Sequence, residues 1–405
     1  MITIERLKRR IEEMAKIGRN GNEGNTRLAL TKEDKAAREL LISWMDELNF
    51  KVRIDDFGNI YGKKEGSDPT LPVVMVGSHI DTVPEGGKFD GVLGVLGALE
   101  AIESFMENGK KHKKSIEIVA FTNEEGARFT PQMLGSGAVT GKFSKEYAYN
   151  RKDRNGLDFE TELQNIEFMG NAKNRLKNVD SFIELHIEQG PVLDERNIPI
   201  GVVDGIAGFS WLEVTIKGGS NHSGTTPMKN RSDSLIIATD VIQVLNNWAK
   251  KKEDGTVLTI GKINVEPGSV NVIPATTTFT VDVRGYDATI FQDTLSEVKQ
   301  LVDEKVQASE QEYRIEEIRT QEPLAFSPKL VHLLDNICKK QKLPHLKMKS
   351  GAGHDAMYMS NITDTAMIFV PSDRGISHSP EEQTEWEDIE QGVTVLYRVI
   401  EKLVK

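Results

Sequence analysis

Three short apolar segments in the first half of the chain end in polar residues. They are PVVMVGSH at 72–79, IEIVAFTNEEG at 116–126 and FIELHIEQG at 182–190. Between the first two, apolar side chains recur at helical spacing from Gly91 to Met106. Apolar runs of strand length that alternate with amphipathic helices are typical of an α/β sheet covered by helices. We therefore predict such a sheet, with chemistry-bearing residues at the ends of its strands.

The pattern changes near Trp211, where apolar and polar residues begin to alternate. Alternation of this kind predicts a strand with one exposed face, at 211–219. The further predicted elements are a helix across 235–248, strands at 257–265 and 276–286, a helix near 289–306 and a strand at 313–319. This β-α-β-β-α-β order is that of a ferredoxin-like unit, an antiparallel sheet with both helices on one face.

After Pro328 the chain returns to the α/β pattern. The expected elements are a helix at 329–341, a glycine-rich segment at 350–356, a strand at 365–371 and a last helix through Leu403. The simplest organisation is one α/β domain made of residues 1–210 and 328–405, with residues 211–327 inserted as a second domain.

Composition narrows the choice of function. The chain has 405 residues, of which 38% are hydrophobic and 28% charged, and its formal net charge is −11. A net negative charge argues against a general binder of nucleic acid or of anionic membranes. Cys338 is the single cysteine, which excludes an intrachain disulfide, and we recognise no signal peptide and no apolar run of membrane-spanning length. We expect a cytoplasmic protein that binds neither nucleic acid nor membrane.

Imidazoles and carboxylates gather at the predicted strand ends. The candidate set is His79, Asp81, Asp90, Glu124, Glu125, His186 and His378. Open α/β sheets place their sites at the carboxyl ends of strands. Nitrogen and oxygen donors without a thiolate suit zinc, manganese or cobalt. With one bridging carboxylate, five such ligands could hold two cations about 3.5–4 Å apart.

Each of these features also has an ordinary structural explanation. A lone His-x-Asp is common, and a histidine at a strand end is more often a core or surface residue than a ligand. Adjacent glutamates usually form a solvated face. Glu124 and Glu125 follow an apolar strand, however, where two buried carboxylates are costly without a cation. The joint occurrence of all these groups at the tips of one predicted sheet favours a metal site.

Eight short motifs, in this order, carry a resemblance to a known family. They are HIDTV, GGKFDG, NEEGARF, ELHIEQGP, NHSGTTPM, SVNVIP, SGAGHDA and GISHSP. Together they resemble the M20-type metallo-amidohydrolases, in the branch of N-carbamoyl-L-amino-acid hydrolases, allantoate amidohydrolases and beta-ureidopropionases. The resemblance runs from about Thr26 to the C-terminus. It implies a zinc-exopeptidase-like catalytic domain with an inserted ferredoxin-like lid and dimerisation domain, and hence a homodimer.

The resemblance also implies roles for the residues at the strand ends. Two divalent cations (Zn, Mn or Co) would be held by five ligands, with His79 and His186 on a different cation from Glu125 and His378, and with Asp90 bridging the two. Asp81 would orient His79 through its free ring nitrogen. Glu124 would be the general base, and Gln189 would contact the substrate.

Further substrate contacts are implied in the inserted domain and in the glycine-rich segment. His222, often supplied across the dimer, or Asn271 would donate to the oxyanion, and Arg284 would bind a substrate carboxylate. The segment Gly351–His354, with Gly353, His354 and the following Asp355, matches a substrate loop. The ordinary alternatives are a surface turn residue for His222 and a salt-bridging strand residue for Arg284.

The expected activity is that of a di-metal N-carbamoyl-L-amino-acid hydrolase, which releases the amino acid, ammonia and carbon dioxide. Allantoate amidohydrolase is the near alternative, although the segment GIAGFSWLEV at 205–214 looks more like the carbamoylase version. A catalytically silent metal-binding protein of the same fold is a second alternative, which the presence of Glu124 and a full ligand set disfavours. An aminoacylase or dipeptidase is a third, disfavoured by HIEQG and GAGHDA.

Overall fold

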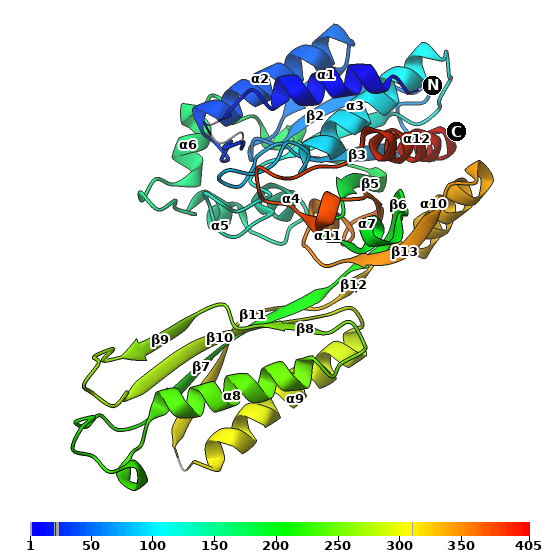
Figure 1. Cartoon of the computed structure of the whole chain (residues 1–405). Coiled ribbons are helices and arrows are strands. Elements are labelled where there is room, and N and C mark those ends of the chain that lie inside the picture. The colour runs from blue at the N-terminus through cyan, green and yellow to red at the C-terminus, as the bar shows by residue number, and fades with distance from the viewer. Residues whose placement is uncertain (1, 20, 22–23, 310) are drawn as a thin grey trace. The chain divides into compact units, whose positions relative to one another are not determined.

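The chain folds into two compact units. The computed structural model describes residues 2–19, 21, 24–309 and 311–405 (Figure 1). One unit consists of Met1–Asp204 and Phe326–Lys405, and the other of Gly205–Ala325. The second unit therefore begins at Gly205 rather than at 211, and ends at Ala325 rather than at 327. The alternation of buried and less buried residues extends back from Trp211 to Gly208, where the first strand of this unit begins.

A mixed sheet forms the centre of the first unit. Its strands lie in the order β1-β2-β4-β3-β5-β14-β6-β12, and β13 also pairs with β6. The bounds are β1 (Lys51–Ile54), β2 (Ile60–Lys64), β3 (Val73–His79), β4 (Ile116–Phe121), β5 (Val179–Ile187), β6 (Ile200–Ile206), β12 (Leu324–Ala325), β13 (His345–Ser350) and β14 (Asp364–Val370). By the division given above, β12 and the last two residues of β6 fall in the second unit. The neighbours β4, β3, β5 and β14 run parallel. These four are the strands that the apolar segments predict, and their carboxyl ends meet at one edge of the sheet.

Helices cover both faces of this sheet, and alternate residues of β5 show how. Leu185 faces α3 (Val92–Glu107) and α12 (Trp386–Leu403). Both helices approach it through a glycine, because a Cβ at Gly97 of α3 would lie 2.9 Å from a Leu185 methyl group and a Cβ at Gly392 of α12 would lie 3.1 Å from one. Glu184 points to the opposite face, where its carboxylate accepts a 2.9 Å hydrogen bond from the main chain of Ala356 in α11 (Asp355–Met359). His186 shares the face of Glu184, because side chains of a strand alternate.

The remaining helices of the first unit were only partly predictable. They are α1 (Ile4–Met14), α2 (Lys32–Glu47), α4 (Leu134–Val139), α5 (Lys145–Tyr149), α6 (Phe159–Asn165), α7 (Val192–Arg196) and α10 (Pro328–Gln341). The apolar pattern predicts α10, but it predicts no element before residue 72. There, α2 begins after Thr31, whose side chain accepts a hydrogen bond from the Asp34 N–H. In the described parts of the chain, no helix combines the length and the apolar character needed to cross a bilayer.

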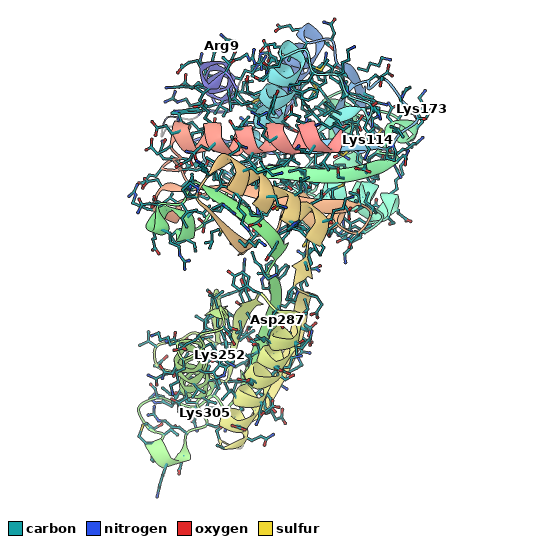
Figure 2. All side chains as sticks on the ribbon, turned by 90° about the vertical axis from the view of Figure 1, so that its right-hand side faces the viewer. Arg9, Lys114, Lys173, Lys252, Asp287 and Lys305 are labelled. Atoms are coloured by element: carbon teal, nitrogen blue, oxygen red, sulfur yellow. The ribbon has the colours of Figure 1, made fainter. Side chains whose placement is uncertain are left out.

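The second unit has the predicted ferredoxin-like order. Its elements are β7 (Gly208–Lys217), α8 (Ser234–Ala249), β8 (Val257–Thr259), β9 (Ile263–Glu266), β10 (Thr276–Gly285), α9 (Ala288–Gln307) and β11 (Glu312–Gln321). The antiparallel sheet has the order β11-β7-β10-β8, and β9 also pairs with β10. Both helices pack on one face, where alternate residues of β7 and β10 form the core. Lys252, just after α8, pairs with Glu297, and Lys305, near the end of α9, pairs with Asp240. Figure 2 labels both lysines on this unit.

The single strand predicted at 257–265 is two short strands. Thr259 pairs with Asp282 and Ile263 pairs with Phe279, so residues 260–262 lie opposite only two residues of β10. One extra residue on one strand is a β-bulge, and Gly261 lies at its centre. The alternation of side chains shifts at such a bulge, which is why the apolar pattern alone does not reveal the break.

Candidate metal centre

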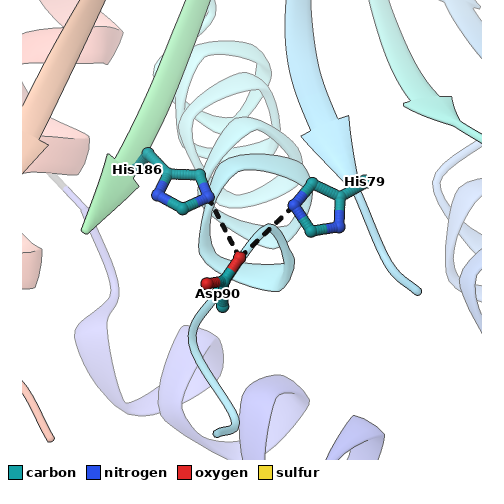
Figure 3. A group of neighbouring side chains, drawn as sticks. All are labelled: His79, Asp90 and His186. Atoms are coloured by element: carbon teal, nitrogen blue, oxygen red, sulfur yellow. Dashed lines mark ion pairs between the residues drawn. The ribbon is translucent and has the colours of Figure 1, made fainter. Parts of the chain in front are cut away.

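The parallel strands bring the predicted metal ligands to one edge of the sheet. His79 is the last residue of β3, and His186 is the next-to-last residue of β5. Glu125 and His378 follow the ends of β4 and β14, and Asp90 lies between β3 and α3. Figure 3 shows Asp90 between the two imidazoles, which reach it from neighbouring strands. The structure therefore brings together five residues that lie at or after the ends of the four parallel strands β3, β4, β5 and β14.

The two oxygens of Asp90 face two different groups of side chains. Oδ1 lies 3.4 Å from His79 Nε2 and 3.3 Å from His186 Nε2. Oδ2 lies 3.3 Å from His378 Nε2, which is in turn 3.4 Å from Glu125 Oε2. Two sets of possible metal ligands result, one of His79, Asp90 and His186 and one of Asp90, Glu125 and His378. The two sets share one carboxylate, that of Asp90.

Main-chain contacts set the orientation of the buried imidazoles. His79 Nδ1 lies 2.9 Å from the carbonyl oxygen of Asp81, and His186 Nδ1 lies 2.9 Å from that of Ile187. A carbonyl can only accept, so each Nδ1 carries a hydrogen, and each Nε2, which faces Asp90, is the ring nitrogen left to bind a cation. Metal-binding histidines are commonly held in this way. Gly91 is required beside His79, because it has φ +65° and a Cβ there would lie 2.3 Å from the ring.

Burial of the two glutamates makes the site receptive to a cation. Burial raises the pKa of Glu124 well above its usual range, and burial together with nearby Asp90 raises that of Glu125 to about 8. Glu125 Oε1 is buried and has no hydrogen-bond partner among the described residues. Unpaired buried carboxylate oxygens are costly. An orphaned oxygen, a shared carboxylate and imidazole lone pairs together fit divalent cations that accept nitrogen and oxygen donors.

Asp81 meets the free ring nitrogen of His79 through its main chain. The residue expected to orient the imidazole does so with its main-chain carbonyl, while its carboxylate is 3.9 Å from Nδ1. That carboxylate instead accepts hydrogen bonds from the main-chain N–H groups of Glu124 and Glu125, at 3.2 and 3.3 Å. Its negative charge thus fixes the turn that presents the two glutamates, whose side chains lie beside His79 and His378.

The predicted substrate contacts of the first unit lie against the ligands. The Gln189 side-chain amide donates to Asp90 Oδ2 at 2.6 Å. The His354 ring is buried 4.6 Å from that of His186, and its Nε2 lies 3.0 Å from Ser350 Oγ. Burial and the neighbouring His186 lower the pKa of His354 well below its usual range. Gly353, partly buried, faces Gln132 and Met133. A substrate role for these residues stays a prediction.

Two residues that the sequence analysis does not identify also touch Asp90. Ser377 Oγ lies 3.1 Å from Asp90 Oδ2, and Glu382 accepts hydrogen bonds from the main chain of Phe89 and Asp90. Their signal in the sequence is slight, because both flank His378 in the polar segment after β14, where serines and glutamates are ordinary surface residues.

Comparison with known proteins decides the family. Peptidase family M20/M25/M40 matches residues 75–402, which is most of the chain. The chain belongs to this family. Across 99% of its length it is 39% identical to N-carbamoyl-L-amino-acid amidohydrolase of a Pseudomonas species (98% of that protein), and 34% identical to allantoate amidohydrolase of Escherichia coli (99% of that protein). The crystal structure of a hydantoinase/carbamoylase family amidase from Burkholderia multivorans matches with a TM-score of 0.93 and 38% identity, covering 100% of this chain and 98% of that one.

These likenesses confirm the fold and the class of enzyme. The chain is a metal-dependent amidohydrolase of the M20 family, in its hydantoinase/carbamoylase branch. The α/β unit and the separate antiparallel unit are those of M20 catalytic and lid domains, as predicted. The His/Asp/Glu clusters fit divalent cations in this M20 enzyme.

The other predicted substrate contacts of this M20 enzyme lie in the second unit. His222 is exposed and bridges to Val272, and its Nδ1 accepts a 3.0 Å hydrogen bond from the Gly224 N–H. Asn271, also exposed, lies beside it, because the Asn271 carbonyl accepts from the Ser223 N–H at 3.1 Å. Arg284 lies on β10 and pairs with Asp282 at 3.1 Å. Within this unit, His222 and Asn271 form one group, and Arg284 has the salt bridge that was its ordinary alternative.

Proposed function

We propose that this M20 amidohydrolase hydrolyses the ureido C–N bond of N-carbamoyl-L-amino acids with two divalent cations (Zn, Mn or Co) bound in each chain. The observation that carries the proposal is that the two oxygens of the Asp90 carboxylate face different groups of side chains. One oxygen faces His79 and His186, and the other faces His378 beside Glu125. A single carboxylate shared in this way supports a pair of cations rather than one.

Glu124 is the general base in this proposal. When bound, divalent cations polarise a carbonyl oxygen and acidify a water molecule. Glu124 follows β4, and its Oε2 is 3.6 Å from His79 Nε2. Its main chain is fixed by Asp81, so the carboxylate is held where a proton must be accepted. From there it can pass that proton to the departing nitrogen, as a base that turns acid does.

The second unit supplies further substrate contacts in this proposal. Hydrolysis of a ureido group builds negative charge on the carbonyl oxygen, and His222 or Asn271 can donate a hydrogen bond to it. The planar guanidinium of Arg284 suits the carboxylate of an N-carbamoyl amino acid, which it can bind through two parallel hydrogen bonds. For that, the pairing with Asp282 has to give way to the substrate.

We also propose that the enzyme is a homodimer joined through the second unit. The edge strands β8 and β9 carry Val257 and Ile263, which are 52% and 48% exposed. Exposed sheet edges with apolar side chains favour pairing with another chain. The test is to dilute the protein and to measure its mass by light scattering together with its kcat. A monomer with the kcat of the undiluted protein would contradict this assembly and any role for a partner's His222.

The choice of substrate rests on the relatives. The N-carbamoyl-L-amino-acid amidohydrolases are 36–39% identical to this chain, and the allantoate amidohydrolases 34–35%. The strand segment at 205–214 favours the same choice. Both substrate types carry the carboxylate and the ureido group that this site would recognise.

The test is release of ammonia by the purified protein from a panel of substrates. The panel contains several N-carbamoyl-L-amino acids, allantoate and N-carbamoyl-β-alanine. We expect the highest kcat/KM on an N-carbamoyl-L-amino acid, loss of turnover after chelation, and recovery with Mn²⁺, Co²⁺ or Zn²⁺. A higher kcat/KM on allantoate would make allantoate the substrate and leave the proposed hydrolysis of a ureido C–N bond unchanged. Full activity of protein shown by elemental analysis to be metal-free would contradict the proposal.

A further inference from the structure

Two loops of the first unit carry one predicted ligand each. Asp90 lies in the loop between β3 and α3, and His378 lies in the segment between β14 and α12. Glu382, also in the second loop, is a buried carboxylate that touches the first. We propose that Glu382 is a positioning residue that locks the two loops together and so holds the bridging carboxylate of Asp90 in register. This inference rests on the proposed pair of cations.

One oxygen of Glu382 holds the main chain of the Asp90 loop. Oε1 accepts hydrogen bonds from the N–H groups of Phe89 and Asp90, at 2.9 and 3.2 Å. The loop wraps closely around this oxygen, because a Cβ at Gly87 would lie 2.1 Å from it. A carboxyl oxygen has two lone pairs and can accept both neighbouring N–H groups at once. The backbone of Asp90 is therefore fixed directly.

The other oxygen of Glu382 reaches the side chain of Asp90 through Ser377. Oε2 lies 3.1 Å from Ser377 Oγ, and that hydroxyl lies 3.1 Å from Asp90 Oδ2. Asp90 Oδ2 is the oxygen that faces His378, the residue after Ser377. Glu382 thus contacts the main chain of Asp90 directly. Through the Ser377 hydroxyl it is also linked to the carboxylate of Asp90 and to the segment that carries His378.

The contacts of Glu382 allow a positioning role to be told apart from simple packing by comparing two substitutions. Groups behind metal ligands orient them, and their removal typically weakens metal binding or activity about 10–100-fold. An amide at position 382 could keep the geometry: its oxygen can accept both N–H groups, and its NH₂ can donate to the Ser377 hydroxyl. A methyl group at 382 loses all three contacts. The difference between the amide and the methyl variant is therefore the signature of positioning.

The experiment compares Glu382→Ala, Glu382→Gln and Gly87→Ala with Glu381→Ala, a change at the exposed neighbouring residue. Zn²⁺ affinity is measured by competition with a chromophoric chelator, the geometry of the site by the visible absorption of bound Co²⁺, and folding by the melting temperature. We expect Glu382→Ala to bind Zn²⁺ about 10–100-fold more weakly and to change the Co²⁺ spectrum. Gly87→Ala should do the same, since its methyl group displaces the carboxylate. Glu382→Gln and Glu381→Ala should resemble the wild type.

The outcomes distinguish this inference from the proposed function. A wild-type protein that binds no cation overturns the proposed metal centre. A wild type that binds Zn²⁺, with Glu382→Ala and Gly87→Ala binding it equally well, overturns only the role of Glu382. An equal loss in Glu382→Gln and Glu382→Ala also overturns it, because geometry would then not be what matters. If Glu382→Ala does not fold, the role of Glu382 is decided by comparing Gly87→Ala with Glu382→Gln in Zn²⁺ affinity and in the Co²⁺ spectrum.

Discussion

The metal centre of the first unit and the predicted substrate contacts of the second differ in how firmly each is held. His79, His186 and Asp90 are buried, and carbonyl groups and a close glycine orient the imidazoles, although the fifth predicted ligand, His378, has a side chain that is 50% exposed. His222 and Asn271 are exposed, and the Arg284 side chain is 38% exposed beside Asp282. The metal centre is thus assembled within its own unit, whereas the side chains of the second unit lie at its surface.

This difference teaches which property each region controls. A preformed ligand cluster spends no ordering entropy when it binds a cation. Exposed side chains act on substrate only once it is bound, so their removal changes turnover without changing the cluster. We therefore expect substitutions in the first unit to alter metal content or chemistry, and substitutions in the second to alter kcat or kcat/KM at constant metal content.

The largest expected effect is that of Glu124→Gln. Loss of a general base typically costs about 10²–10⁴-fold in rate, and an amide cannot accept the proton. Metal content by elemental analysis should remain that of the wild type, because Glu124 is not among the five predicted ligands. The matched variant Asp90→Ala should lose metal instead. If the two variants had the same metal content, the assigned roles would be wrong.

His222→Ala should have the next largest effect. Removal of one oxyanion donor typically costs about 10²–10³-fold in kcat. Because His222 is exposed within its unit, the melting temperature and the metal content should not change. His332→Ala, a change at a histidine of α10 with no predicted role, is the control. A kcat close to that of the wild type would assign His222 to an ordinary surface turn.

Arg284→Ala should have the smallest of the three effects. A charge-assisted bidentate contact contributes about 1.5–3 kcal/mol, or roughly 10–150-fold in kcat/KM. Arg284→Lys keeps the charge but not the planar fork, and should also be impaired. Asp282→Asn removes the salt-bridge partner and leaves the guanidinium, so it should be nearly neutral.

Substrates with an amidated carboxylate provide the control for Arg284. They should be poor for the wild type and almost indifferent to Arg284→Ala, since the group that the guanidinium binds is missing. An equal loss of kcat/KM on both kinds of substrate, or a loss in Asp282→Asn as large as in Arg284→Ala, would show that the salt bridge with Asp282 is structural.

The sequence predicts what depends on short-range pattern. Apolar runs of strand length locate β3, β4, β5 and β14, and parallel pairing then brings the residues at their ends together. The ferredoxin-like order of the second unit follows from alternation in the same way. His79 and His186 could therefore be placed near each other from the sequence, although they are far apart along the chain.

The contacts that the sequence does not predict depend on loops. The carbonyl rather than the carboxylate of Asp81 meets His79, which follows from the local turn and not from residue type. Gln189 reaches Asp90 from a backbone with φ +59°. Glu382 meets residues 89 and 90 across nearly the whole chain, and no periodicity marks that pairing. Such contacts arise only when separate loops are packed against each other.

The central claim is that Asp90 bridges two cations, and anomalous diffraction from crystals grown with Zn²⁺ or Mn²⁺ tests it most directly. The account predicts two anomalous peaks about 3.5–4 Å apart. One should lie beside His79 and His186, the other beside Glu125 and His378, with Asp90 between them. A single peak, or two peaks of which one has no contact with Asp90, would contradict the account.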